Sequence, residues 1–152
     1  MLLRFSDGEV FATGAQPYLS RSIGAADPSN RIIVEVEIGG LRTSAVIDTG
    51  APYVVLDPSL AQVLGVNLRT ALFSTILSIR GHRVQGSLHR MNLTFLADEG
   101  EEITVEATVF IPQVDTGSWA LPSFIGWTGC LERLRFAVDP LDETFYFGAV
   151  TE

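Results

Sequence analysis

The chain carries the stretch Ala45-Val46-Ile47-Asp48-Thr49-Gly50-Ala51, in which an apolar run leads into an aspartate and a glycine. A second apolar run follows at residues 53–56. A glycine in such a turn allows the backbone of another segment to approach closely, and the two flanking strands hold the acid at a fixed point. This stretch therefore predicts a carboxylate fixed in a turn between two β-strands.

The residues before this stretch predict a β-hairpin. Apolar side chains alternate along residues 31–38, which places them on one face of a strand. Gly39-Gly40 is typical of a two-residue turn. Residues 41–47 then return as the partner strand, so Asp48 is expected at the end of this strand.

The residues after the stretch predict a short helix. Asp57 suits the N-cap, Pro58 the first helical position and Gly65 the C-terminal cap. Turn-bounded apolar segments predict further strands at residues 9–13, 70–79, 83–97, 103–111, 123–127, 135–139 and 144–147, and a second short helix at 128–134. Because no internal repeat or linker is visible, we expect an N-terminal arm over residues 1–30 and one all-β domain over residues 31–152.

Composition narrows the class of protein. A chain of 152 residues is long enough for one domain with a sizeable core, and 14 glycines and seven prolines favour a turn-rich β fold. The net charge of −8 argues against nonspecific nucleic-acid binding. A single cysteine, Cys130, excludes an internal disulfide framework. The N-terminus is a poor secretory signal and no apolar window is long enough to span a bilayer, so we expect a cytoplasmic protein without membrane partners.

The Asp48 stretch resembles the active-site loop of the retropepsin-like (retroviral-type) single-domain aspartic proteases, which is two apolar residues followed by Asp-Thr-Gly-Ala. The resemblance implies a closed, β-barrel-like acid-protease fold with one or two short helices. It also implies an aspartic endopeptidase that needs no cofactor and no metal. In this family Asp48 would be catalytic, Thr49 would brace the opposite loop, Gly50 would admit backbone beside the catalytic pair, and Ala51 matches the single-domain members.

The implied chemistry needs two aspartates that hold a water between them, since two carboxyls about 3 Å apart share one proton. This chain is too short for a second lobe, so the resemblance implies a homodimer in which Asp48 meets its symmetry mate. An extended peptide or protein would be the substrate. The strands at the chain ends, especially residues 144–147, are the expected interface.

Two further segments match the family in order and spacing. Phe124-Ile125-Gly126 would be the late strand that threads beside the active-site loop, although taken alone it resembles any buried strand. The turn Arg80-Gly81-His82 occupies the place of the flap that covers the substrate. A plain solvent-exposed hairpin is the alternative there. Neither His82 nor His89 has cysteine or histidine neighbours at ligand spacing, so no metal site is expected.

A second copy of the signature occurs at Asp115-Thr116-Gly117-Ser118. Gln113 interrupts the apolar run before it, and no strand and helix follow. The remaining residues are also too few for a second sheet. We therefore expect a mobile loop, with a second catalytic aspartate as the alternative.

Two other functions remain open at this level, because a fold does not imply a function. One is a noncatalytic dimeric module that binds extended peptides on the same fold. The other is a small β-barrel interaction domain, which requires the Asp48 motif to be accidental. The distance between the two Asp48 carboxylates in a dimer would discriminate among these readings.

Overall fold

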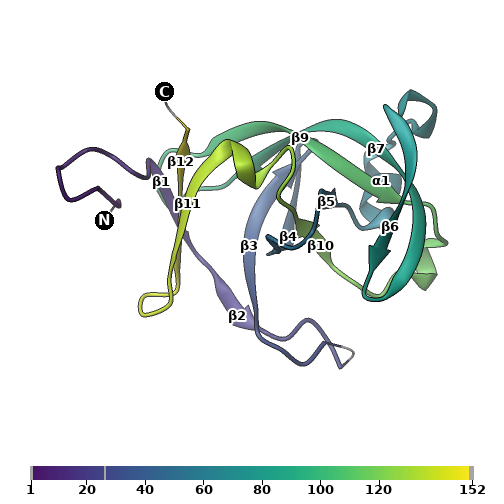
Figure 1. Ribbon diagram of the computed structural model, residues 1–152, viewed down its shortest axis with the longest axis horizontal. Helices are drawn as coiled ribbons and strands as arrows, with labels where there is room; N and C mark the ends of the chain where they lie inside the picture. The colour runs from purple at the N-terminus through teal and green to yellow at the C-terminus, as the bar shows by residue number, and fades with distance from the viewer. Residues whose placement is uncertain (1, 26, 151–152) are drawn as a thin grey trace.

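The computed structural model of the protein describes residues 2–25 and 27–150. Strands dominate the described residues, with one α-helix, α1 (Pro58–Leu64), and short 3₁₀ turns at Leu68–Thr70, Thr116–Ser118 and Leu131–Arg133. Figure 1 shows the strands, which are β1 (Gly14–Pro17), β2 (Leu19–Arg21), β3 (Arg31–Ile38), β4 (Leu41–Ile47), β5 (Val54–Val55), β6 (Phe73–Ile79), β7 (His82–Phe95), β8 (Glu99–Gly100), β9 (Ile103–Pro112), β10 (Ser123–Ile125), β11 (Leu134–Asp139) and β12 (Thr144–Ala149). The expected all-β architecture is confirmed.

The hairpin of β3 and β4 forms as expected. Gly39 and Gly40 have φ angles of 59° and 88°, the left-handed pair that a two-residue hairpin turn requires. This turn sets Ile38 opposite Leu41 and brings Ile33 opposite Val46. The register therefore carries Asp48 to the position just beyond the paired end of β4.

The larger sheet has the strand order β2-β3-β4-β10-β5-β9-β7-β6. Because β3 also pairs with β7, the strands from β3 to β7 in this order close into a ring, and β2 and β6 extend from it. The strand β10 lies between β4 and β5, although it comes about 70 residues later in the chain. This late insertion is the feature of the fold that most directly positions the site.

The smaller sheet has the order β11-β12-β1-β8 and lies at the end of the molecule away from β6 (Figure 1). The strand expected at residues 9–13 in fact lies at Gly14–Pro17, so this part of the expected N-terminal arm is built into the sheet. Gly14 allows this pairing, since a Cβ there would come within 2.4 Å of the Phe147 ring. The shift depends on a contact with the far end of the chain, which the local sequence pattern does not report.

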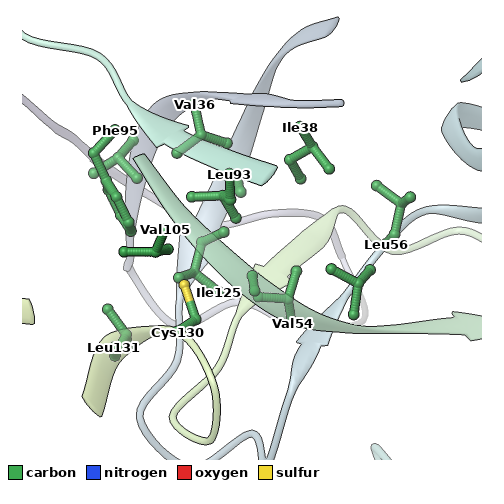
Figure 2. Close-up of a cluster of buried hydrophobic side chains, with 14 of the residues drawn as sticks. Val36, Ile38, Val54, Leu56, Leu93, Phe95, Val105, Ile125, Cys130 and Leu131 are labelled. Atoms are coloured by element: carbon green, nitrogen blue, oxygen red, sulfur yellow. The ribbon is translucent and has the colours of Figure 1, made fainter. Parts of the chain in front are cut away.

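The core joins the two sheets. Phe95 of β7 packs against Phe145 and Phe147 of β12, with ring centroids 5.9–6.0 Å apart. Figure 2 shows side chains of β3, β5, β7, β9 and β10 gathered with Cys130 and Leu131 in one apolar cluster. These residues are buried, so the segment that follows β10 is anchored in the same core as the strands beside Asp48.

The helix α1 is confirmed with its caps. The Asp57 side chain accepts a hydrogen bond from Ser59 N at 2.9 Å, and Gly65 ends the helix with a φ of 66°. The helix expected at residues 128–134 is wrong, because only a 3₁₀ turn forms at Leu131–Arg133. Gly129, with a φ of 74°, interrupts helical geometry there. No helix of the described residues is long and apolar enough to cross a membrane.

Candidate active site

The Asp48 carboxylate is held by its own turn. Its Oδ1 accepts a hydrogen bond from the Gly50 amide at 2.9 Å, and the Ala51 amide donates to the Asp48 carbonyl at 3.1 Å. The Asp48 amide donates to the carbonyl of Ile125 at 2.9 Å. Both the side chain and the backbone of Asp48 are therefore fixed, while within the described residues Oδ2 accepts no hydrogen bond.

The late strand β10 lies between the two strands that flank this turn and pairs with both of them. Phe124 of β10 lies opposite Val46 in a parallel pairing with β4 and opposite Val55 in an antiparallel pairing with β5. Beyond the strand, Trp127 N donates to Ala51 O at 2.9 Å, and Thr128 N donates to Pro52 O at 2.8 Å. The structure thus brings the predicted late strand against the predicted active-site loop.

Gly126 makes this close approach possible. A Cβ at this position would lie 2.0 Å from the Tyr53 carbonyl oxygen and 2.8 Å from that of Ala51. No side chain can be accommodated against backbone atoms at such distances. The glycine that ends the apolar strand is therefore required by packing against the loop that carries Asp48.

The hairpin of β6 and β7 stands beside the Asp48 loop. A cavity of about 280 Å³ lies between them, lined by the Asp48 loop, by residues 77–80 of the hairpin and by Phe124. Of the three predicted flap residues, Arg80 lines this cavity, whereas Gly81 and His82 are exposed and lie outside its lining. The hairpin has the position that a cover over the site would need.

Arg31 also lines the cavity and was missed as a site residue. Its guanidinium donates to the Asp27 carboxylate at 2.9 and 3.1 Å. The register of the β3–β4 hairpin could have predicted this position. Ile33 lies opposite Val46, so two residues further along the same register Arg31 falls opposite Asp48. Asp27 had no comparable signal, since it lies in an irregular segment before β3.

Neighbouring charges shift the pKa values of Asp27 and Arg31. The Arg31 guanidinium, and after it that of Arg80, holds the pKa of Asp27 below its ordinary value, against the opposing effect of burial. The pKa of Arg31 is raised mainly by its hydrogen bond to Asp27, and the negative charge of Asp48 adds to this effect. Arg31 therefore stays charged beside the Asp48 loop.

Thr49 extends from the loop into solvent, and its hydroxyl makes no hydrogen bond within residues 2–25 and 27–150. Its expected role as a brace for an opposite loop stays a prediction, because that partner would come from another copy of the chain. The same residue ranges contain no group of three or more histidine, cysteine, aspartate or glutamate side chains that could hold a metal ion.

The second Asp-Thr-Gly sequence, at Asp115, lies outside the cavity at Asp48. Asp115 precedes the 3₁₀ turn Thr116–Ser118 and makes no side-chain cap to it. It lines a larger hollow, of about 750 Å³, between α1 and the segment that follows β9. This hollow contains neither Asp48 nor Arg80 in its lining, so we assign the candidate site to the smaller cavity, where the fixed carboxylate is.

The comparisons with known proteins agree with this geometry. The sequence profile described as aspartyl protease matches residues 34–118, which include the Asp48 loop and the β6–β7 hairpin. A crystal structure of a retropepsin-like aspartic protease from Rickettsia conorii is similar over 90% of this chain and 94% of that chain, with a TM-score of 0.55 and 19% sequence identity. A search of curated proteins gives no match.

The structural likeness establishes the retropepsin-like fold, and the profile covers more than half of the chain. The chain therefore belongs to the aspartyl protease family and is an aspartic peptidase with a retropepsin-like fold.

Proposed function

We propose that this peptidase acts as a homodimer, in which Asp48 and the partner's Asp48 hold the attacking water between them. The observation that carries the proposal is the single braced Asp-Thr-Gly-Ala loop at the cavity, because acid–base hydrolysis of an amide takes two carboxyl groups. An isologous two-fold contact supplies the second carboxyl without a second lobe.

The chemistry follows from the shared proton. The ionised carboxylate takes a proton from the water as the water oxygen attacks the peptide carbonyl carbon, and the protonated carboxyl donates a hydrogen bond to the carbonyl oxygen. A proton then passes to the peptide nitrogen, and the carbon–nitrogen bond breaks. Because the pair titrates as a unit, activity should be highest at mildly acidic pH and fall on both sides.

The substrate that fits this arrangement is an extended peptide. An extended backbone can lie beneath the β6–β7 hairpin and be bound through main-chain hydrogen bonds. Val55, Leu77, Ile79 and Phe124 give the cavity an apolar lining, which supports a preference for apolar side chains beside the scissile bond. The Gly50 amide remains engaged with Asp48 and does not contribute to this binding.

The expected interface needs one correction. The strand β12, which contains residues 144–147, lies between β11 and β1, so its two backbone edges are already paired. It has no edge left for another chain. Among the described residues no strand pairs with the outer edge of β11, and this strand is half-buried along most of its length.

Contacts near the catalytic loop favour β11 as the interface. Trp127 packs edge-on against Phe136 of β11, with ring centroids 6.4 Å apart, and is 44% exposed. Its amide also donates to Ala51 of the catalytic loop. A second copy that covers Trp127 and the β11 edge would therefore lie beside Asp48.

Subunit mixing tests the proposal. Wild-type protein is mixed with an excess of the Asp48→Asn variant, and cleavage of a peptide library is followed between pH 4 and 8 while sedimentation reports the assembly state. Mixed dimers should be inactive, so activity should fall more steeply than simple dilution allows. Undiminished activity in the mixture, or full activity from a strict monomer, contradicts the proposal. A dimer that binds extended peptides and cleaves none supports the noncatalytic module instead.

A further inference from the structure

Asp27 joins the tip of the β6–β7 hairpin to the start of β3. Arg80 Nη1 lies 2.7 Å from Asp27 Oδ2, and Arg31 Nε lies 2.9 Å from the same oxygen. The side chain of Asp27 is only 7% exposed. A carboxylate removed from water needs cationic partners, and these two arginines supply them.

Arg80 is held in a second way. Its guanidinium lies over the ring of Phe124, with the central carbon 5.4 Å from the ring centroid. Phe124 belongs to β10 and lines the cavity at Asp48. The hairpin tip is therefore attached both to the segment before β3 and to the strand that braces the catalytic loop.

The backbone gives an independent reason to assign a role to Arg80. It has a φ of 54°, in the left-handed region, at a turn position where glycine, asparagine or aspartate is preferred. The turn of the β3–β4 hairpin has glycine at both such positions. Arg80 shares this conformation with Glu143 among the described non-glycine residues, and its ion pair and ring contact offset the cost at the hairpin tip.

We propose that Arg80 and Asp27 form a latch that holds the β6–β7 hairpin closed over the cavity at Asp48. The cavity of about 280 Å³ lies between the Asp48 loop and the hairpin, so the position of the hairpin sets how wide a path a peptide has to the Asp48 carboxylate. Arg80 supplies the ion pair and the cation–π contact that hold the tip, in addition to the apolar packing of Leu77, Ile79 and Val84. The gating of substrate rests on the proposed function, whereas the closed hairpin is a property of the chain in either case.

Amide hydrogen exchange of residues 73–88 tests the latch without any need for activity. The variants are Asp27→Asn, which removes the carboxylate charge, and Arg80→Asn, which removes the guanidinium while suiting the left-handed turn. Arg83→Gln is the matched control, because Arg83 is exposed on the same hairpin and forms no ion pair within the described residues. Residues 33–47, which leave out the Asp27 partner Arg31, serve as the internal reference for global stability.

Exchange in the hairpin should become roughly three- to tenfold faster in both latch variants and stay at the wild-type rate in the control. Hairpin exchange in Arg80→Asn and Asp27→Asn that equals that of Arg83→Gln overturns the latch. If Asp27→Asn unfolds, the Arg80→Asn variant at the exposed turn decides the question.

A second measurement tests gating. Association of a statine-containing peptide, whose hydroxyl replaces the attacking water, is followed by stopped flow. A latch predicts a faster association rate in both variants and an unchanged rate in Arg83→Gln. Faster hairpin exchange with an unchanged association rate overturns gating. A complete lack of peptide binding counts against the proposed function, and the exchange data still decide whether the hairpin is latched.

Discussion

The chain contains the tripeptide Asp-Thr-Gly twice, and the structure treats the two copies differently. Asp48 lies between two strands, accepts a hydrogen bond from the Gly50 amide and borders a cavity. Asp115 begins a 3₁₀ turn in which Ser118 N donates to its carbonyl at 2.8 Å, and its side chain makes no hydrogen bond within the described residues.

The surroundings, rather than the tripeptide, separate the two copies. The loop at Asp48 exchanges backbone hydrogen bonds with Ile125, Trp127 and Thr128 from the late strand and the turn after it. Among the described residues, no strand pairs beside Asp115. A signature of this kind therefore marks a site only where a second segment braces it.

Removing the carboxylate charge gives the sharpest test of this comparison. Asp48→Asn should lower turnover by roughly a thousandfold or more, because it removes both the base and the shared proton. Asp115→Asn should retain most of the activity. Peptide cleavage at mildly acidic pH measures both, with thermal unfolding as the check on folding. Loss of activity in the Asp115 variant alone would mean that the wrong aspartate has been chosen.

The glycines of the two regions offer a second test. Gly126→Ala places a Cβ 2.0 Å from the Tyr53 carbonyl oxygen, so the late strand must move away from the Asp48 loop. We expect a loss of about 2–3 kcal/mol in the free energy of unfolding, together with a loss of activity.

Gly117→Ala is the matched control, because a Cβ there meets nothing within 4 Å and the backbone is not left-handed. Urea denaturation of both variants makes the measurement. Equal stability of the two would show that bracing by the late strand does not distinguish the regions.

The pH dependence of the free energy of unfolding provides a third test, at the buried His89. Burial lowers the pKa of His89 below its ordinary value of 6.5, and its Nε2 lies 2.8 Å from Ser87 Oγ. The unfolded state therefore takes up a proton more readily than the folded state, so the free energy of unfolding should fall as pH decreases below about 6.5 and level off below the folded pKa.

The His89→Gln variant cannot titrate and should show a weaker dependence on pH over this range, whereas His82→Gln, at an exposed histidine, should behave as wild type. Urea denaturation between pH 7.5 and 4.5 provides the comparison. An identical pH dependence in all three proteins would exclude His89 as the group that lowers the stability in acid.

The smallest effect concerns Cys130, which lies in the turn that follows the late strand. Burial raises the pKa of this thiol to about 12, so it should not react with a disulfide reagent at pH 8 in the folded protein. Gly126→Ala should increase the reaction rate, because Leu131 N donates to Gly126 O in this turn, and Gly117→Ala should not. Rapid reaction of Cys130 in the wild type would show that the turn after β10 opens as easily as the loop at Asp115.

Several elements beside the site could be predicted because their determinants are local. The Gly39-Gly40 turn sets the register of β3 and β4, and Asp57 and Gly65 cap α1. Each of these features depends on the backbone preferences of a few consecutive residues. The same register even contained the position of Arg31 opposite Asp48, which sequence reasoning left unused.

Two expectations failed where distant segments meet. Residues 128–134 read as a helix, but Gly129 adopts a left-handed conformation in which a Cβ would lie 2.4 Å from Thr108 Oγ1. The first strand lies at Gly14–Pro17 because it pairs with β12 at the other end of the chain. In both cases tertiary contacts outweighed the local pattern.

The sequence by itself determined the Asp48 turn, the hairpin that leads into it and the helix that follows, because these depend on neighbours within a few residues. Only the tertiary structure decided that β10 pairs with both β4 and β5, that Asp27 meets Arg80, and that a cavity forms between the Asp48 loop and the β6–β7 hairpin. Such contacts join residues tens of positions apart, and they form only when burial of the whole core compensates for the entropy of closing the chain.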